Sequence, residues 1–247
     1  RETLEPRFKI IGSDLWSNDP QFAAAAVATG VTGICGSGII EVIAELYLAG
    51  VISRDGVIDG SIAARSPRIV PHGRTFSYML YTGPQTLSIT QTDVRAIQLA
   101  KAALSAGIRL LMDRLGVERV DRIRLAGAFG SHIDVKYAAV LGMIPDCDLE
   151  QVTSAGNAAG SGARIALLDS RSRATIEALV RRVEKIETAI EPLFQAHFVD
   201  AMAIPHRTAD YPSLRKVVDL PVATPTASGG EGPRRRARRA ATPAQPV

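Results

Sequence analysis

Three short glycine-rich turns are the residues of this chain whose types and spacing best suit chemistry. They lie at Gly33–Gly38, Gly127–Gly130 and Gly156–Gly162, and each opens a segment with helical periodicity. Glycine lets a ligand approach the backbone closely, and a helix start offers unpaired N–H groups and a positive dipole end. Such turns suit a nucleotide, but they also occur where a helix merely packs tightly on a sheet. None matches a Walker A loop or G-x-G-x-x-G, so spacing alone leaves both interpretations open.

Several other residues have an ordinary structural interpretation beside a functional one. Asp93 and Arg95 suit an interface, or equally a helix cap and a surface charge. His132 follows a glycine turn, where it either approaches a nucleotide or is a simple loop residue. Cys35 fits a small buried thiol at a helix start better than a redox group. Trp16 receives no role, and the sequence names no catalytic residue.

The turns must be positioned by strands and helices that alternate along the chain. The pattern predicts a long helix that begins at Thr90 or Thr92 and ends before Gly116. Its apolar stripe is Ile97, Leu104, Ile108, Leu111 and Leu115. Other helices are predicted at 39–48, 135–141, 163–168, 173–187 and 194–202, and strands at 7–11, 56–58, 77–81, 87–89, 122–126 and 151–154. Alternation from 90 to 187 indicates an α/β layer with helices packed on a sheet.

The formal net charge of +4 comes entirely from the end of the chain, where five arginines and Glu231 are the only charged residues after Val222. Residues 1–222 are therefore about neutral, and the high pI does not indicate a basic nucleic-acid-binding face. No apolar run reaches the roughly 20 residues that span a bilayer, and no secretory leader is visible. We expect a cytoplasmic protein with no nucleic-acid or membrane partner.

The composition changes twice along the chain. We expect a folded portion over residues 1–205, a weakly structured extension over 206–222 and a disordered tail, rich in Arg, Pro and Ala, over 223–247.

The two cysteines cannot supply the four thiolates of an iron–sulfur cluster, and no metal site is predicted. Because the sequence opens at Arg1 in mid-stream, we expect a piece of a longer polypeptide.

Four segments, taken in order, together resemble the actin-like ATPase (ASKHA) part of the reductive activators of corrinoid proteins. The resemblance covers about residues 1–205. The last two segments favour this family over actin-like sugar or carboxylate kinases. The segments are Thr32–Ile40, Ile89–Ala103, Leu125–Gly130 (Leu-Ala-Gly-Ala-Phe-Gly) and Gly156–Ala163 (Gly-Asn-Ala-Ala-Gly-Ser-Gly-Ala).

The resemblance implies an RNase H-like half of an actin-like ATPase domain, with a mixed sheet flanked by helices. Full-length members carry a [2Fe–2S] ferredoxin domain. They couple ATP, bound with Mg²⁺, to the reduction of a Co(II) corrinoid to Co(I) on a partner methyl-transfer protein. The nucleotide lies between two such halves. The nucleotide-binding candidates implied are Gly127, Ala128, Phe129, Gly130, Gly156, Asn157 and Gly160, with Gly36, Ser37 and Gly38 as further candidates.

The chain also departs from the actin-like pattern. Its two phosphate loops, each an Asp followed by glycines, have no counterpart, since Asp55-Gly56 and Asp59-Gly60 are typical of turns. We expect these loops and the ferredoxin cysteines upstream of Arg1. Two interpretations remain. The chain forms the adenosine side of an activator's nucleotide cleft and is inactive alone, or it is a non-catalytic module for dimerisation or for docking a corrinoid protein.

Overall fold

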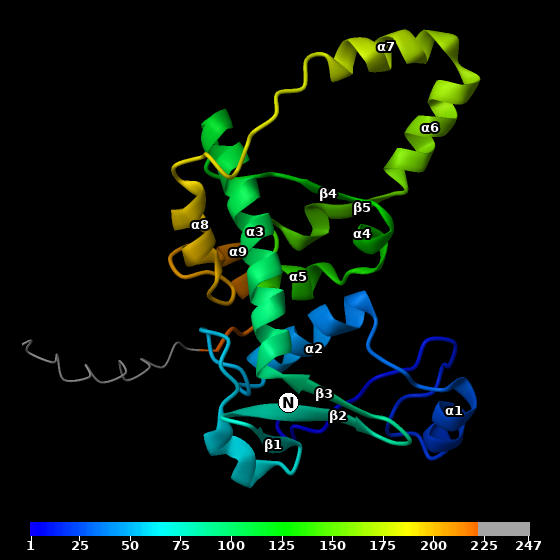
Figure 1. Cartoon of the computed structure of the whole chain (residues 1–247), viewed down its shortest axis with the longest axis vertical. Coiled ribbons are helices and arrows are strands. Elements are labelled where there is room, and N and C mark those ends of the chain that lie inside the picture. Colours follow the sequence, from blue (N-terminus) through cyan, green and yellow to red (C-terminus); the bar gives the residue numbers. More distant parts are fainter. Residues whose placement is uncertain (222–247) are drawn as a thin grey trace, which may run out of the picture.

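The computed structural model describes residues 1–221, except for the side chains of Ala128 and Phe129. The predicted disorder of 223–247 lies outside these residues. The α/β class is confirmed. The elements, shown in Figure 1, are α1 (Phe22–Thr29), α2 (Gly36–Leu48), β1 (Ile69–His72), β2 (Thr75–Thr82), β3 (Thr86–Thr90), α3 (Gln91–Leu115), β4 (Ile123–Ala126), α4 (Ala128–His132), α5 (Val135–Leu141), β5 (Val152–Gly156), α6 (Ala158–Leu168), α7 (Ser170–Val180), α8 (Phe194–Ala201) and α9 (Pro212–Arg215).

The strands of the described residues lie in two sheets rather than in the one mixed sheet that we expected. β1, β2 and β3 form an antiparallel sheet, and β4 pairs with β5 in parallel. The chain leaves the first sheet through the 25 residues of α3, which at 1.5 Å per residue extend about 37 Å. β4 therefore begins far from β3, as Figure 1 shows.

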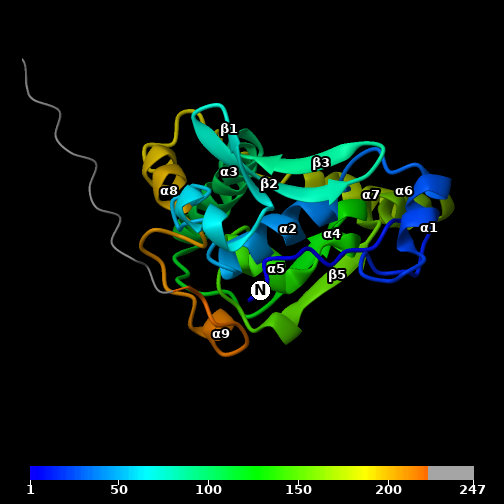
Figure 2. The same ribbon diagram turned by 90° about the horizontal axis from the view of Figure 1, so that it is seen from below.

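The hydrophobic core lies around α2. This helix is situated between the three-stranded sheet and α5 in both views of the molecule (Figure 1, Figure 2). The sequence predicts a helix at 39–48, and its residues Ile43, Leu46 and Tyr47 are buried, while Ile39 and Val42 pack partly buried against the same cluster. The predicted run at 56–58 forms no strand, because only Ile58 pairs, in an isolated bridge with Ile52.

The long helix α3 has the boundaries that the sequence predicts. Thr90 is the cap: its Oγ1 accepts from the Asp93 N–H at 3.2 Å, and the Asp93 carboxylate accepts from the Thr90 N–H at 2.8 Å. This reciprocal pair settles the choice between Thr90 and Thr92 and gives Asp93 a capping role. Gly116 ends the helix with a left-handed φ of 65°.

Within residues 1–221, no helix has both the length and the apolar character required to cross a bilayer.

The buried face of α3 is not the stripe that we predicted. Leu104, Leu111 and Leu115 are 45%, 52% and 75% exposed. The buried residues lie on another face and are Val94, Gln98, Lys101, Ala102, Ala106, Leu110 and Met112. Helix α8 packs against α3, and small alanines allow two helices to approach closely. A polar residue on this face is buried only because it finds hydrogen-bond partners there.

Two of these buried polar residues hold the chain around residues 202–206. The Lys101 ammonium group donates to the carbonyls of Ala203 and Pro205, the latter at 2.7 Å. Gln98 Nε2 donates to the carbonyls of Met202 at 2.8 Å and Asp55 at 3.1 Å. These bonds connect three distant segments of the chain through one helix face.

Residues 206–221 are packed, although their sequence pattern is weak and we expected a loosely structured extension. Tyr211, Leu214, Val218 and Leu220 belong to the main hydrophobic cluster. Asp146 caps the short helix α9 by accepting from the N–H groups of Ser213 at 2.9 Å and Leu214 at 3.0 Å. The apolar residues here are spaced for neither a helix nor a strand, so periodicity could not reveal them.

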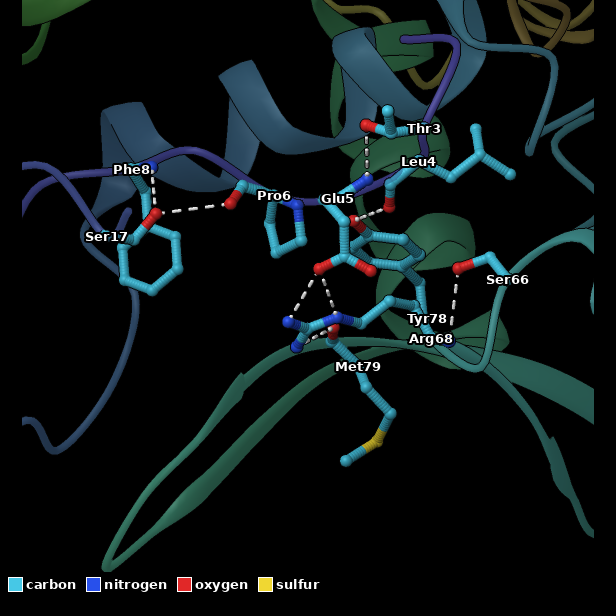
Figure 3. Close-up of polar contacts among 10 residues, drawn as sticks. All are labelled: Thr3, Leu4, Glu5, Pro6, Phe8, Ser17, Ser66, Arg68, Tyr78 and Met79. Carbon is cyan, nitrogen blue, oxygen red and sulfur yellow. Dashed lines mark hydrogen bonds and ion pairs between the residues drawn. The ribbon is translucent and has the colours of Figure 1, made fainter. Parts of the chain in front are cut away.

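The first residues cross the edge of the core without forming the strand predicted at 7–11. Only Lys9 pairs, in an isolated bridge with Trp16. Figure 3 shows what holds the segment instead: the Tyr78 hydroxyl donates to the Leu4 carbonyl at 2.8 Å, and Arg68 forms an ion pair with Glu5 at 2.8 Å. Leu4 has a left-handed φ of 56°, which costs about 1 kcal/mol for a residue with a side chain. Its burial and the tyrosine bond offset this cost.

Helices α6 and α7 extend away from the rest of the chain (Figure 1) and contain no buried residue. We call these two helices the arm. The helix predicted over 173–187 ends at Val180, and its apolar face is open. Leu179 is 59% exposed and Val183 is 69% exposed. Nothing within residues 1–221 therefore covers this apolar face.

Tyr78→Phe should lower the free energy of unfolding by about 1 kcal/mol, because the buried Leu4 carbonyl loses its partner. Urea unfolding of the full chain measures this change. Tyr81→Phe is the matched control, since the Tyr81 hydroxyl has no hydrogen-bond partner within residues 1–221. An equal loss in both variants would contradict a specific role for the Tyr78 bond.

The free energy of unfolding should rise with pH between about 7 and 9, because Lys101 is buried. Burial lowers the pKa of Lys101 to about 7, whereas an unfolded lysine titrates near about 10.4. In this window the unfolded chain holds one more proton, so the free energy of unfolding rises by up to about 1.4 kcal/mol per pH unit. Urea titrations at several pH values should show this slope in the wild type and its loss in Lys101→Met. Equal slopes in both proteins would show that Lys101 stays charged in the fold.

Candidate functional site

The structure brings two of the three predicted glycine turns side by side. β4 and β5 are parallel, so their carboxyl ends meet at one edge, and the turns that begin at Gly127 and Gly156 both follow there. The Gly127 N–H donates to the Gly156 carbonyl at 2.8 Å. The carboxyl edge of parallel strands is the usual place for ligands in open α/β folds. We call these two turns the glycine edge.

A β-bulge shapes the glycine edge. Leu125 pairs with Ser154 but Ala126 pairs with Gly156, so Ala155 has no partner in the ladder. Gly127 and Gly156 both have left-handed φ angles, 98° and 61°, which favour glycine over other residues. Open space surrounds both Cα atoms on the Cβ side. Backbone conformation, rather than crowding, therefore explains these two glycines.

Gly130 and Asn157 have structural roles at the same edge. A Cβ on Gly130 would lie 2.9 Å from Leu125 Cβ and 3.1 Å from the Leu125 backbone carbon, so this glycine lets α4 pack directly on β4. Asn157 Oδ1 accepts from the Gly160 N–H at 2.8 Å and caps α6. The packing interpretation that the sequence left open thus applies to Gly130. Asn157 and Gly160 bring the start of α6 next to the other turn.

The third turn lies on a different element. Gly36, Ser37 and Gly38 form the first turn of α2, a helix that contacts both α4 and α5. Cys35 caps this helix, since its Sγ accepts from the Gly38 N–H at 3.3 Å. Cys35 is exposed, so the expected helix-start role is present but the expected burial is wrong.

An acidic cluster at the contact of α2 with α5 was not predicted. Glu45 accepts from the Arg1 guanidinium at 2.7 Å and from the Tyr137 hydroxyl at 2.5 Å. The bond with Arg1 holds the pKa of Glu45 below its ordinary value. Burial, followed by the charge of Asp134, raises the pKa of Glu41, one turn earlier. These groups are isolated charges in the sequence, and only packing brings them together.

Within residues 1–221 the glycine edge presents backbone groups and not a cluster of metal-ligating side chains. Within residues 1–221 no group of three or more His, Cys, Asp or Glu side chains is placed to hold a metal ion. Cys35 and Cys147 are unconnected, and two thiols cannot ligate an iron–sulfur cluster. The glycine edge leaves backbone groups open beside the Cα atoms of Gly127 and Gly156.

Comparison with known proteins places the chain in a family. Residues 1–215 match the family described as "C-terminal domain of RACo the ASKHA domain". The chain belongs to this family. The match of this RACo C-terminal domain continues ten residues past the boundary at 205 that we expected, into the segment that packs around α9.

Two relatives of this RACo C-terminal domain have descriptive names. "Corrinoid activation enzyme RamQ" of Eubacterium limosum is 36% identical over an alignment of 178 residues, and the match covers 67% of this chain and 30% of that protein. A solved structure, "Reductive activator for corrinoid,iron-sulfur protein", is 33% identical with a TM-score of 0.63, and the match covers 70% of this chain and 28% of that one. The chain thus spans less than a third of the relatives that it matches.

Gly130→Ala should destabilise the RACo C-terminal domain by about 1–3 kcal/mol, because its new methyl group collides with the backbone of β4. Gly162→Ala is the matched control. A Cβ at Gly162 meets nothing within 4 Å inside α6, so alanine there should be neutral or raise stability by up to about 1 kcal/mol. Urea unfolding of the two variants measures the difference. A neutral Gly130→Ala would contradict the close packing of α4 on β4.

Proposed function

We propose that this chain forms the adenosine side of the nucleotide site in an ATP-dependent reductive activator of a corrinoid protein. The observation that carries the proposal is the glycine edge, in which Gly127 and Gly156 are joined backbone to backbone at 2.8 Å. It occurs in a chain of the RACo C-terminal family. Two relatives, moreover, have names that describe activation of corrinoid proteins.

In this proposal the chain's own residues bind and orient the base and ribose. The Gly127–Gly130 turn presents backbone to one side of the adenosine, and Gly156, Asn157 and Gly160 form the adjoining side at the start of α6. The first turn of α2, with Gly36, Ser37 and Gly38, lines the same cleft. The β- and γ-phosphates and Mg²⁺ are held by phosphate loops in another part of the longer polypeptide.

The proposed reaction is the return of a corrinoid cofactor from Co(II) to Co(I) on a partner methyl-transfer protein. One electron comes from a [2Fe–2S] cluster held elsewhere in the longer polypeptide, and ATP supplies the free energy for this step. We place the protein in the cytoplasm, where free thiols such as Cys35 and Cys147 stay reduced. The chain alone binds nucleotide weakly and performs no reduction.

NMR titration of the full chain with ATP and Mg²⁺ tests the nucleotide part of the proposal. We expect saturable shifts centred on the amides of Gly127–Gly130 and Gly156–Gly160. GTP, whose base has different hydrogen-bonding groups, should produce weaker changes at the same concentrations. Shifts that are absent at millimolar ATP, or that are spread over the surface, would contradict an adenosine site at the glycine edge.

The corrinoid-reduction part of the proposal is tested on the longer protein that carries this domain. With ATP and a reductant, the longer protein should convert the Co(II) absorption of its corrinoid partner to that of Co(I). Gly156→Val should slow this conversion at least about tenfold, because valine cannot readily adopt the left-handed φ at this position. Gly107→Ala, in α3 away from the glycine edge and with nothing within 4 Å of the new methyl group, is the control. Equal rates in wild type and Gly156→Val would contradict a role for the glycine edge.

A second candidate function is a non-catalytic module that dimerises or docks a corrinoid protein. The open apolar face of the arm favours it, since Leu168 is 79% exposed and Leu179 is 59% exposed. In that case analytical ultracentrifugation should show a dimer or a complex that Leu179→Asp disrupts, while the ATP titration shows no site. A chain that binds ATP at the glycine edge and forms neither a dimer nor a complex with the corrinoid protein would exclude this alternative.

A further inference from the structure

Two serine hydroxyls connect the glycine turns through their side chains. Ser131, in α4, donates from Oγ to the Gly127 carbonyl at 3.1 Å. Ser154, in β5, donates from Oγ to Ser131 Oγ at 3.1 Å. Ser154 Oγ also accepts from the Gly156 N–H at 3.1 Å. A continuous chain of hydrogen bonds therefore runs from Gly156 through both hydroxyls to Gly127.

The direction of each bond in this hydroxyl chain is determined. A serine hydroxyl has one proton to donate, and Ser131 gives its proton to the Gly127 carbonyl. Ser131 can therefore only accept from Ser154, which in turn can only accept from the Gly156 N–H. Every donor in the chain has one acceptor. Replacing either serine removes two of the three bonds that involve these hydroxyls.

The hydroxyl chain lies across the β-bulge. Ala155 is the residue without a ladder partner, and the hydroxyl chain links the residues on both of its sides, Ser154 and Gly156, to the turn after β4. Bulges increase local twist and often re-aim residues next to binding sites. The hydroxyls therefore bridge this bulge and connect it to the other turn.

Both serines are exposed, so water competes for their bonds and they contribute little to global stability. Their contribution should instead appear when a ligand covers the glycine edge and excludes water, because hydrogen bonds strengthen as the local dielectric falls. A role limited to stabilising the fold would have placed these hydroxyls in the core. Their position between the two turns points to the arrangement of the turns.

We infer that Ser131 and Ser154 are positioning residues that set the distance between the two glycine turns for nucleotide binding. The inference rests on the proposed function, because it concerns the same adenosine site. It adds that affinity depends on two hydroxyls which need not touch the nucleotide. Because both act through one path, their effects on affinity must overlap rather than add.

A double-mutant cycle of ATP affinity in the full chain, measured by NMR titration, tests the inference. Ser131→Ala and Ser154→Ala should each weaken ATP about three- to tenfold, the range expected for one hydrogen bond. The double variant should be no weaker than either single variant. Ser154→Thr, which keeps the hydroxyl, should bind as the wild type does. Thr153→Ala, one residue earlier on the opposite face of β5, is the control and should also bind normally.

Amide hydrogen exchange without nucleotide gives an independent measurement. The Gly127 amide, protected by its bond to the Gly156 carbonyl, should exchange faster in both alanine variants and at the wild-type rate in Thr153→Ala. If the wild type binds ATP and the serine variants bind it equally well, or their effects simply add, the positioning role is overturned and the proposed function stands. If the wild type binds no ATP at all, the proposed function fails and this inference fails with it.

Discussion

The parallel pairing of β4 with β5 is the constraint on which the candidate site depends. Parallel strands run in the same direction, so the turns that follow them must emerge at one edge. Here that pairing ends in the backbone bond between Gly127 and Gly156 and in the bulge at Ala155. Without it, the two turns would be separated by the chain that connects them. The left-handed glycines and the serine hydroxyls refine an arrangement that the strand pair creates.

Helix α3 provides the second constraint. It carries the chain from the antiparallel sheet to the parallel pair, and it holds residues 202–206 through Lys101 and Gln98. These polar residues are buried because backbone carbonyls of that segment satisfy their N–H groups. The same segment leads to the buried residues around α9, which complete the core beside α5. A polar face of one helix thus holds together parts of the fold that are about a hundred residues apart in sequence.

The two helices of the arm are stabilised by local capping and not by burial of their apolar residues. Its helices form from local signals, since Asn157 caps α6 and Asp169 caps α7. Their apolar residues face open space within the described part of the chain, and relatives of this family are more than three times as long as the matched segment. Local capping is enough to start a helix, but burial of an apolar stripe needs a surface opposite it. In the proposed activator, the rest of the longer polypeptide or a partner supplies that surface.

The sequence by itself determined what depends on local interactions. Thr90, Asp93 and Gly116 delimit α3, Val135–Leu141 is α5 as predicted, and the turns at Gly127 and Gly156 follow strands as expected. These features need only caps, periodicity and glycine conformations within a few residues. Only the tertiary structure decided which face of α3 is buried, because Lys101 and Gln98 look exposed until distant carbonyls meet them. It likewise divided the strands into two sheets and joined Ser131 to Ser154, 23 residues apart. Those outcomes depend on contacts between remote segments, and neither periodicity nor the spacing of a motif records such contacts.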